Sequence, residues 1–260
     1  MNNKVLIQDG QSYINKCINK SLVQLMDHQK TQLLFHKFHG QLMHIYQTQK
    51  PAQVIWPISE YSQEIHDFIN EYRECEVILL MDAVLDSDVD MTSFFNQCPN
   101  VKVIAPESRS SLYINCVATY DRCYDSYVFS FINHTKNNKT LAILSMDNDK
   151  NKILDPLIYP NANNPIVAIN NPDFISPINI GIASPEHLSL MFNEYSAVID
   201  LSGNYELECS ACKINYIDYH ADIVEAYNNQ IFTDPIEDLE NKSYEYLVKT
   251  QILSLIKGQS

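Results

Sequence analysis

The sequence predicts an α/β protein with parallel sheets, arranged as two halves that join near the middle of the chain. Three observations lead to this prediction. Short apolar runs alternate with segments whose apolar residues recur at helical spacing. Residues 76–84, EVILLMDAV, form a continuous apolar run of the kind that fills a central parallel strand. A polar stretch, His134–Lys139, separates two such alternating series.

The first alternating series ends at residue 132. We expect its strands at residues 4–7, 31–38, 52–58, 76–84, 101–108 and 127–132. We expect its helices at residues 14–29, 62–75, 89–97 and 110–125, where apolar residues recur every three or four positions. Strands that alternate with helices in this way build βαβ units and hence a parallel sheet.

The second series repeats the alternation. We expect its strands at residues 140–146, 165–170, 178–182, 196–202, 213–218 and near 231–232. We expect its helices at residues 185–195, 206–212, 221–228 and 244–258. The two series predict two Rossmann-like domains, residues 1–135 and residues 136–260, with a cleft between them.

The net charge is strongly acidic and unevenly distributed. The formal charge of the chain is −14. Residues 1–139 carry −3 (12 Lys and Arg against 15 Asp and Glu), and residues 140–260 carry −11 (6 against 17). Such a surface repels phosphate backbones, and no run of basic residues offsets it, so the sequence disfavours nucleic acid as a partner.

The sequence also favours a cytoplasmic location. No apolar run approaches the roughly 18–20 residues that a membrane helix needs, so we expect no membrane span. The start, MNNKVLIQDGQ, resembles a strand and turn more than a signal peptide. The seven cysteines show no framework spacing, so we expect reduced thiols. No sequence feature indicates the oligomeric state.

The stretch AVIDLSGNYELECSACKINYID, residues 197–218, carries the strongest local signals. Gly203-Asn204 can form a tight turn between a strand and a helix, which places backbone N–H groups at the carboxyl edge of the sheet. Glu208 could accept hydrogen bonds there from ribose hydroxyls, or it could simply favour the helix dipole. Cys209 and Cys212 have no second Cys/His pair nearby, which favours packed helix residues over a metal or redox site.

Residues 184–233 resemble the donor-binding segment of GT-B glycosyltransferases, especially the retaining group with a Glu-x7-Glu signature. The run Glu208–Ile217 fits the EAxACGxPVI unit of that family position by position. Glu208 matches the family glutamate that binds the donor ribose, and Asp200 stands eight residues earlier, where the family has a glutamate beside the donor sugar. The sequence departs from the family with Lys213 in place of Gly and Asn215 in place of Pro.

The resemblance implies a glycosyltransferase that moves a sugar from a nucleotide-sugar to an unidentified acceptor, with retention of configuration and without a metal or other cofactor. It implies that Asp200 is the catalytic residue and that Glu208 holds the ribose. The expected ligands of the diphosphate and sugar are the turn Ser202, Gly203, Asn204 and Tyr205 together with Lys150 and Lys152. On the acceptor side we expect Gly10 and Gln11, the remnant of a glycine-rich loop, and Glu107 and Arg109, which could equally form a loop salt bridge.

Two other functions remain open at this point. The weak basic complement is compatible with a catalytically inactive GT-B-like binding or accessory subunit. The Asn-, Lys- and Ile-rich composition is compatible with a phage-type glycosyltransferase that modifies nucleic-acid bases, but the charge opposes it. The histidines at positions 28, 36, 39 and 44 cluster in sequence, and we expect surface or core positions for them rather than a metal site.

Overall fold

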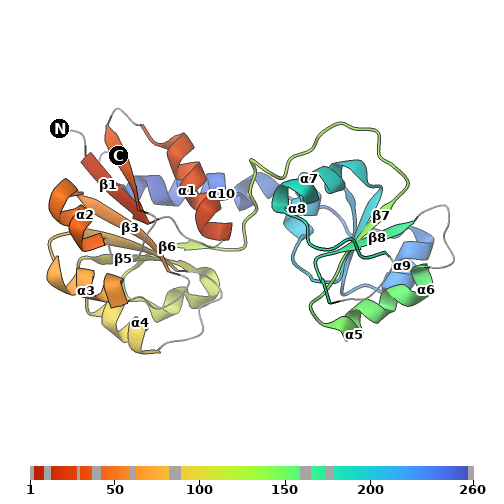
Figure 1. Cartoon of the computed structure of the whole chain (residues 1–260), viewed down its shortest axis with the longest axis horizontal. Helices are drawn as coiled ribbons and strands as arrows, with labels where there is room; N and C mark the ends of the chain where they lie inside the picture. Colours follow the sequence, from red (N-terminus) through yellow and green to blue (C-terminus); the bar gives the residue numbers. More distant parts are fainter. Residues whose placement is uncertain are drawn as a thin grey trace. The chain divides into compact units, whose positions relative to one another are not determined.

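The chain folds into two compact units, each with its own parallel sheet (Figure 1). The computed structural model describes residues 3–8, 13–27, 30–36, 42–58, 63–81, 89–158, 165–173 and 178–256. Unit 1 contains Met1–Cys123 and Lys242–Ser260, and unit 2 contains Tyr124–Asn241. We expected a single division at residue 135; the units instead change at Cys123, and the C-terminal segment belongs to the first unit.

Unit 1 is built on a six-stranded sheet in the order β2-β1-β3-β4-β5-β6. All neighbouring strands run parallel, as the alternating pattern predicts. The strands are β1 (Asn3–Gln8), β2 (Thr31–His36), β3 (Gln53–Ile58), β4 (Glu76–Met81), β5 (Val101–Pro106) and β6 (Cys116–Tyr120).

Helices cover both faces of this sheet, which explains why its central strands are apolar at most positions. Alternate residues of β3 divide between the faces: Val54 and Trp56 lie in one apolar cluster and Ile55 in the other. The first cluster packs against α2 (Leu42–Gln49), α3 (Gln63–Glu71) and α4 (Val89–Asn96). The second packs against α1 (Tyr13–Leu25) and the C-terminal segment, and Figure 1 shows these two groups of helices on opposite sides of the sheet.

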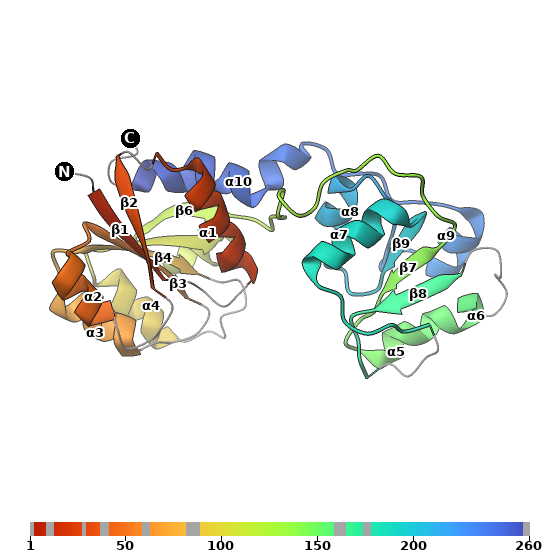
Figure 2. The same ribbon diagram turned by 45° about the horizontal axis from the view of Figure 1, so that its top comes forward.

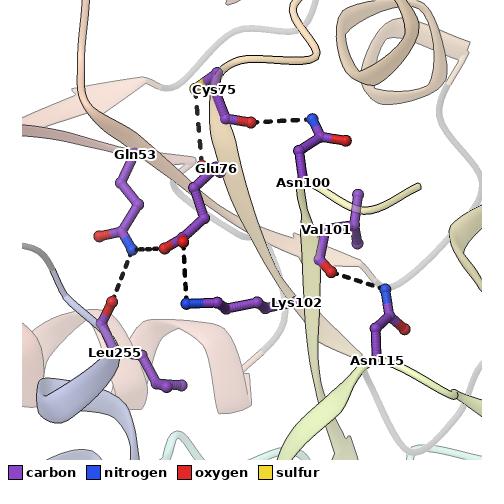
Figure 3. A network of polar contacts seen from close by, with 8 residues as sticks. All are labelled: Gln53, Cys75, Glu76, Asn100, Val101, Lys102, Asn115 and Leu255. Carbon is purple, nitrogen blue, oxygen red and sulfur yellow. Dashed lines mark hydrogen bonds and ion pairs between the residues drawn. The ribbon is translucent and has the colours of Figure 1, made fainter.

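The C-terminal segment joins unit 1 because its apolar side chains complete the second cluster. Helix α10 (Tyr244–Leu247) continues as a π-helical turn, Val248–Ile252, and a 3₁₀ turn, Leu253–Leu255. The buried Gln53 side chain donates to the carbonyl oxygen of Leu255 at 2.7 Å and to the Glu76 carboxylate (Figure 3). Glu76 in turn pairs with Lys102 Nζ at 3.0 Å, so Gln53, which holds the end of the segment, is itself linked to the next two strands.

Two sequence-based predictions in the middle of the chain were wrong. Residues 110–125 do not form one helix: a 3₁₀ helix covers Glu107–Leu112, and β6 then pairs with β5. Residues 127–132 form no strand, because side chains of α7 (Pro185–Glu194) take their backbone groups. Ser189 Oγ donates to the carbonyl oxygen of Val128 at 2.6 Å, and Asn193 Oδ1 accepts from the N–H of Ile132 at 2.7 Å.

Unit 2 has a four-stranded parallel sheet in the order β10-β9-β7-β8 (Figure 2). The strands are β7 (Thr140–Ile143), β8 (Ile166–Ile169), β9 (Ala197–Asp200) and β10 (Asn215–Asp218). Helix α7 and helix α8 (Glu206–Ala211) contribute to the apolar cluster on one face. The other cluster includes residues of the run α5 (Asn148–Asn151), Lys152–Leu154 and α6 (Asp155–Ile158), and of α9 (Ile223–Asn229).

Two short strands expected in unit 2 do not form. Residues 178–182 make one isolated bridge, between Ala168 and Asn179, and then Gly181 turns the backbone to a φ of +98°. Residues 231–232 lie outside the sheet: the N–H of Ile231 donates to the carbonyl oxygen of Ala226 at 2.9 Å, and the N–H of Thr233, which follows the pair, donates to that of Tyr216 at 2.7 Å. In the part of the chain that the structure describes, no helix combines the length and apolar character needed to cross a membrane.

Candidate functional site

The sheet of unit 2 has a point where the direction of strand addition reverses. β8 follows β7 on one side, whereas β9 and then β10 are added on the other side. The reversal lies between β7 and β9, and the loops that follow these two strands diverge to opposite faces of the sheet. Ligands of open α/β sheets bind at such a point, outside the carboxyl ends of the strands. The candidate site therefore consists of the loops after β7 and β9, together with the neighbouring loop after β10.

Asp200 organises the loop after β9. It is the last residue of β9 and has no exposed surface. Its Oδ1 accepts from the N–H of Ser202 at 2.9 Å, from Ser202 Oγ at 2.6 Å and from the N–H of Gly203 at 3.1 Å. Its Oδ2 accepts from the N–H groups of Asn204 at 2.9 Å and Tyr205 at 2.8 Å. One carboxylate thus binds every backbone N–H group from Ser202 to Tyr205.

This arrangement explains how α8 begins without an ordinary cap. The N-cap residue, Tyr205, makes no side-chain capping bond. Helix starts leave backbone N–H groups without intrahelical partners, and a carboxylate next to them is favourable for both hydrogen bonding and the helix dipole. Asp200 supplies that carboxylate from the preceding strand, so it links the end of β9 to the start of α8.

These contacts occupy the groups of the turn that we expected to bind the ligand. We expected the amides of Ser202–Tyr205 to face a diphosphate and Asp200 to act on the sugar. In the structure those amides donate to Asp200, whose carboxylate is enclosed by the turn. Both expected roles stay predictions, and each requires Asp200 to release the turn.

Two tyrosines, Tyr216 on β10 and Tyr219 just after it, also lie against the Asp200 turn. Gly203 has a φ of +70°, and a methyl group added to it would lie 2.6 Å from Cε1 of Tyr219. Tyr216, on β10, places its hydroxyl 3.5 Å from Asp200 Oδ2. Burial, and then the charge of Asp200, raise the pKa of the Tyr216 phenol, so this hydroxyl stays protonated and can donate to the carboxylate.

Glu208 lies on α8, one turn beyond the Asp200 loop. Its side chain is buried, with 7% of the residue exposed, so it does not extend into bulk solvent. Cys209 on α8 and Cys212, the C-cap residue that follows it, lie fully buried in the apolar cluster, so both are packed as predicted, although only Cys209 lies in the helix. Burial raises the pKa of the Cys212 thiol to about 11, as expected for a thiol that is shielded from water.

The lysines expected to face a diphosphate follow β7. Lys150 lies in α5 and Lys152 begins the next turn, both exposed. Lys152 Nζ pairs with Asp149 Oδ1 at 2.6 Å, which lowers the pKa of Asp149 and raises that of Lys152. Because β7 and β9 are parallel neighbours, this segment and the Asp200 loop lie at the same edge of the sheet.

A network of asparagines at this edge was missed by sequence reasoning. Asn171 is buried and donates through Nδ2 to the carbonyl oxygen of Ser145 at 2.7 Å and to Asn148 Oδ1 at 2.9 Å. Asn151 is also buried, and it exchanges two hydrogen bonds with the backbone of Ser145. These bonds tie the loop after β8 to the loop after β7. The available signal was the pair Asn170-Asn171, where the predicted strand ends, a position typical of turns.

The acceptor-side residues expected in unit 1 are only partly described. Gly10 and Gln11 lie outside the described residues. Glu107 and Arg109 lie in the 3₁₀ helix that directly follows β5, at the carboxyl edge of the six-stranded sheet. Across the described ranges, no group of three or more His, Cys, Asp or Glu side chains is placed to hold a metal ion.

No protein-family model and no curated protein sequence matches the chain. Among solved structures, a putative UDP-N-acetylglucosamine 2-epimerase from Listeria monocytogenes is similar, with a TM-score of 0.50 and 8% identity over 96% of this chain and 87% of that one. HepE (Alr3699) of Anabaena, solved with UDP and glucose, has a TM-score of 0.49 and 8% identity over 82% of this chain and 80% of that one. The UDP-GlcNAc 2-epimerase of Methanocaldococcus jannaschii has a TM-score of 0.47 and 11% identity over 100% of this chain and 94% of that one.

The fold is GT-B-like. The parallel six-stranded and four-stranded sheets, each with helices on both faces, agree with the Listeria protein, which has the highest TM-score of these three. At 8% sequence identity, this structural similarity shows the fold alone.

Proposed function

We propose that unit 2 of this GT-B-like protein binds a nucleotide-sugar at the carboxyl edge of its sheet, and that the chain transfers the sugar to an acceptor. The observation that carries this proposal is the buried carboxyl of Glu208, which lies on α8 next to the reversal point of the sheet. The resemblance to the Glu-x7-Glu group places the glutamate that binds the donor ribose at this position. A carboxylate there can accept hydrogen bonds from the 2′- and 3′-hydroxyls of a ribose.

The remaining roles follow from the order of groups in the ligand. If the ribose lies at Glu208, the diphosphate lies toward the loops after β9 and β7, within reach of Lys150 and Lys152. Lysines there would neutralise the charge that develops on the departing diphosphate. If the chemistry follows the Glu-x7-Glu group, Asp200 acts beside the donor sugar and its configuration is retained. UDP is the first nucleotide to test, because the similar Listeria protein is described as a putative UDP-N-acetylglucosamine 2-epimerase.

A second candidate function is favoured by the enclosed carboxylate of Asp200. The chain places its own anion among the four amides that could otherwise receive a phosphate. One of the two nearby lysines, Lys152, is already paired with Asp149. A GT-B-like binding or accessory protein that does not transfer sugar accounts for both features.

Calorimetric titration of the whole chain with UDP, and with UDP-glucose and UDP-N-acetylglucosamine, tests the proposal. We expect Glu208→Gln to weaken UDP binding about 10- to 100-fold, because a charge-assisted hydrogen bond contributes about 1.5–3 kcal/mol. Glu206→Gln, on the same helix, is the matched control and should change the affinity less than threefold. Equal affinities of the wild type and Glu208→Gln would return Glu208 to a structural role.

A donor-hydrolysis assay with the same sugars separates the two candidate functions. Release of UDP that depends on Asp200 supports the transferase. Binding of UDP without hydrolysis or transfer, over a panel of sugar acceptors, supports the non-catalytic protein. Absence of binding to UDP and to GDP, ADP and their sugars would contradict both.

A further inference from the structure

Two aromatic residues lie at the carboxyl edge of the sheet of unit 2 and have no role in the proposed function. Tyr219 and His220 directly follow β10, and their ring centroids lie 3.7 Å apart with an angle of 38° between the planes. Both residues are exposed, Tyr219 by 42%. The last residue of β10, Asp218, pairs in register with Asp200, so the aromatic pair follows the strand next to the Asp200 loop.

The ring of Tyr219 is held against that loop. Its Cε1, Cδ1 and Cζ atoms would lie 2.6, 2.9 and 3.2 Å from a methyl group on Gly203, so the ring occupies the space that the missing side chain leaves open. The backbone that carries the pair is fixed as well. The N–H of His220 donates to Asp218 Oδ1 at 3.2 Å, and the N–H of Ala221 donates to the carbonyl oxygen of Asp218 at 3.0 Å.

An exposed aromatic pair with a fixed position resembles the lining of a ligand site more than ordinary surface. Exposed aromatic area is unfavourable in water, and aromatic rings in ligand sites make apolar contacts while a hydroxyl or ring nitrogen supplies the hydrogen bond. The apolar C–H face of a pyranose ring, edged by hydroxyl groups, matches both properties of Tyr219 and His220.

We propose that Tyr219 and His220 form a stacking subsite for the sugar ring of the nucleotide-sugar. This inference rests on the proposed function. With the ribose at Glu208 and the diphosphate along the loop that begins at Asp200, the next group of the ligand is the sugar, whereas the base lies on the far side of the ribose. Tyr219 contacts Gly203 in that loop, and so it lies where the sugar follows the diphosphate.

Titration calorimetry with UDP, UDP-glucose and UDP-N-acetylglucosamine tests this subsite. Tyr219→Leu keeps bulk over Gly203 but removes the aromatic face, and we expect it to weaken binding of the UDP-sugars about tenfold while UDP binding changes less than twofold. Tyr219→Phe should keep the affinity for the UDP-sugars within threefold. The matched control is Tyr246→Leu, because Tyr246 is a tyrosine of unit 1 that is exposed to a similar extent, 40%.

Saturation-transfer NMR on bound UDP-glucose gives a second measurement. Glucose protons should receive saturation in the wild type and lose it, relative to the uracil protons, in Tyr219→Leu. If that variant does not fold, as judged by its thermal midpoint, His220→Leu carries the same test.

Three results would overturn the subsite, and they differ from one another. An equal loss of UDP and UDP-sugar affinity would assign the pair to the nucleotide. Unchanged affinities and saturation would show that the pair takes no part in binding. A wild type that binds no nucleotide would contradict the proposed function, and the subsite with it.

Discussion

The carboxylate of Asp200 accepts a hydrogen bond from the backbone N–H of Tyr205 at 2.8 Å, across five residues of chain. This bond joins the end of β9 to the residue that precedes α8. Three more backbone N–H groups and the hydroxyls of Ser202 and Tyr216 donate to the same carboxylate. Asp200 therefore determines whether the loop is a rigid structural element or a part of the site that can open.

We expect Asp200→Asn to lower the free energy of unfolding by about 2–4 kcal/mol. The amide has one acceptor oxygen, and its NH₂ group would face backbone N–H groups that need acceptors, so at least one charge-assisted bond is lost and a buried donor is left without a partner. Urea denaturation measures the change. The matched control is Asp218→Asn, at the paired position of β10, where the Oδ1 atom accepts from the N–H of His220. Similar losses in both variants would contradict a special role of Asp200 in the turn.

Gly203→Ala should be more destabilising than Gly181→Ala. Both glycines have positive φ, +70° and +98°, which costs about 1–2 kcal/mol for a residue with a side chain. Gly181 faces open space, whereas a methyl group on Gly203 would meet the Tyr219 ring, which adds about 1–3 kcal/mol of overpacking. Chemical denaturation of the two variants should show this difference. If Tyr219 moves away at no cost, the two losses will be equal.

Lys150→Ala and Lys152→Ala should each weaken UDP binding about three- to tenfold and leave uridine binding unchanged, if these lysines face the diphosphate. The effect should shrink at high salt, because both lysines are exposed and their charges are screened. Lys139→Ala is the control, since this exposed lysine precedes β7 at the opposite edge of the sheet. A salt-independent loss, or one that extends to uridine, would argue against a phosphate contact.

The free energy of unfolding should fall as the pH rises from about 9 to about 11. Burial raises the pKa of the Cys212 thiol to about 11 from its ordinary value of 9.0. Between these values the folded state keeps a proton that the unfolded state has lost, so each such group lowers stability by up to about 1.4 kcal/mol per pH unit. Urea titrations at pH 8 and pH 10.5 should show a smaller fall for Cys212→Ala. Cys123, whose pKa burial raises to about 12, contributes in the same direction in both proteins.

Ending the chain after Asn241 should destabilise unit 1 while unit 2 keeps its structure. The removed segment buries Tyr244, Leu247, Val248 and Ile252 against α1 and the sheet. It also supplies the carbonyl oxygen of Leu255 that accepts from the buried Gln53 (Figure 3). Amide hydrogen exchange should show lost protection in β1, β3 and α1, and unchanged protection in β7 and β9. Equal loss in both units would contradict the division of the chain into these units.

The apolar patterns in the sequence were sufficient to predict most of the framework. The first six residues of the run EVILLMDAV became β4 (Glu76–Met81), which is buried on both faces, because a strand covered by helices on both sides needs apolar residues at successive positions. The segment 197–218 became strand, turn and helix as expected, since Gly203 permits the turn and apolar residues mark the strands. Two segments could not be predicted in this way. Strand β6 forms because its backbone pairs with β5, and residues 127–132 stay out of the sheet because side chains of α7, which is distant in sequence, take their backbone groups.

The sequence by itself determined the alternation of strands and helices, the acidic charge of the second half and the candidate carboxylates Asp200 and Glu208, because these depend on residue type and spacing. Only the tertiary structure decided what the carboxylates contact. It enclosed Asp200 within its own turn, buried Glu208 on α8, placed Tyr219 over Gly203 and returned the C-terminal segment to unit 1. Spacing places a side chain at one end of an element, but its hydrogen-bond partners come from whichever segments the sheet order brings beside it.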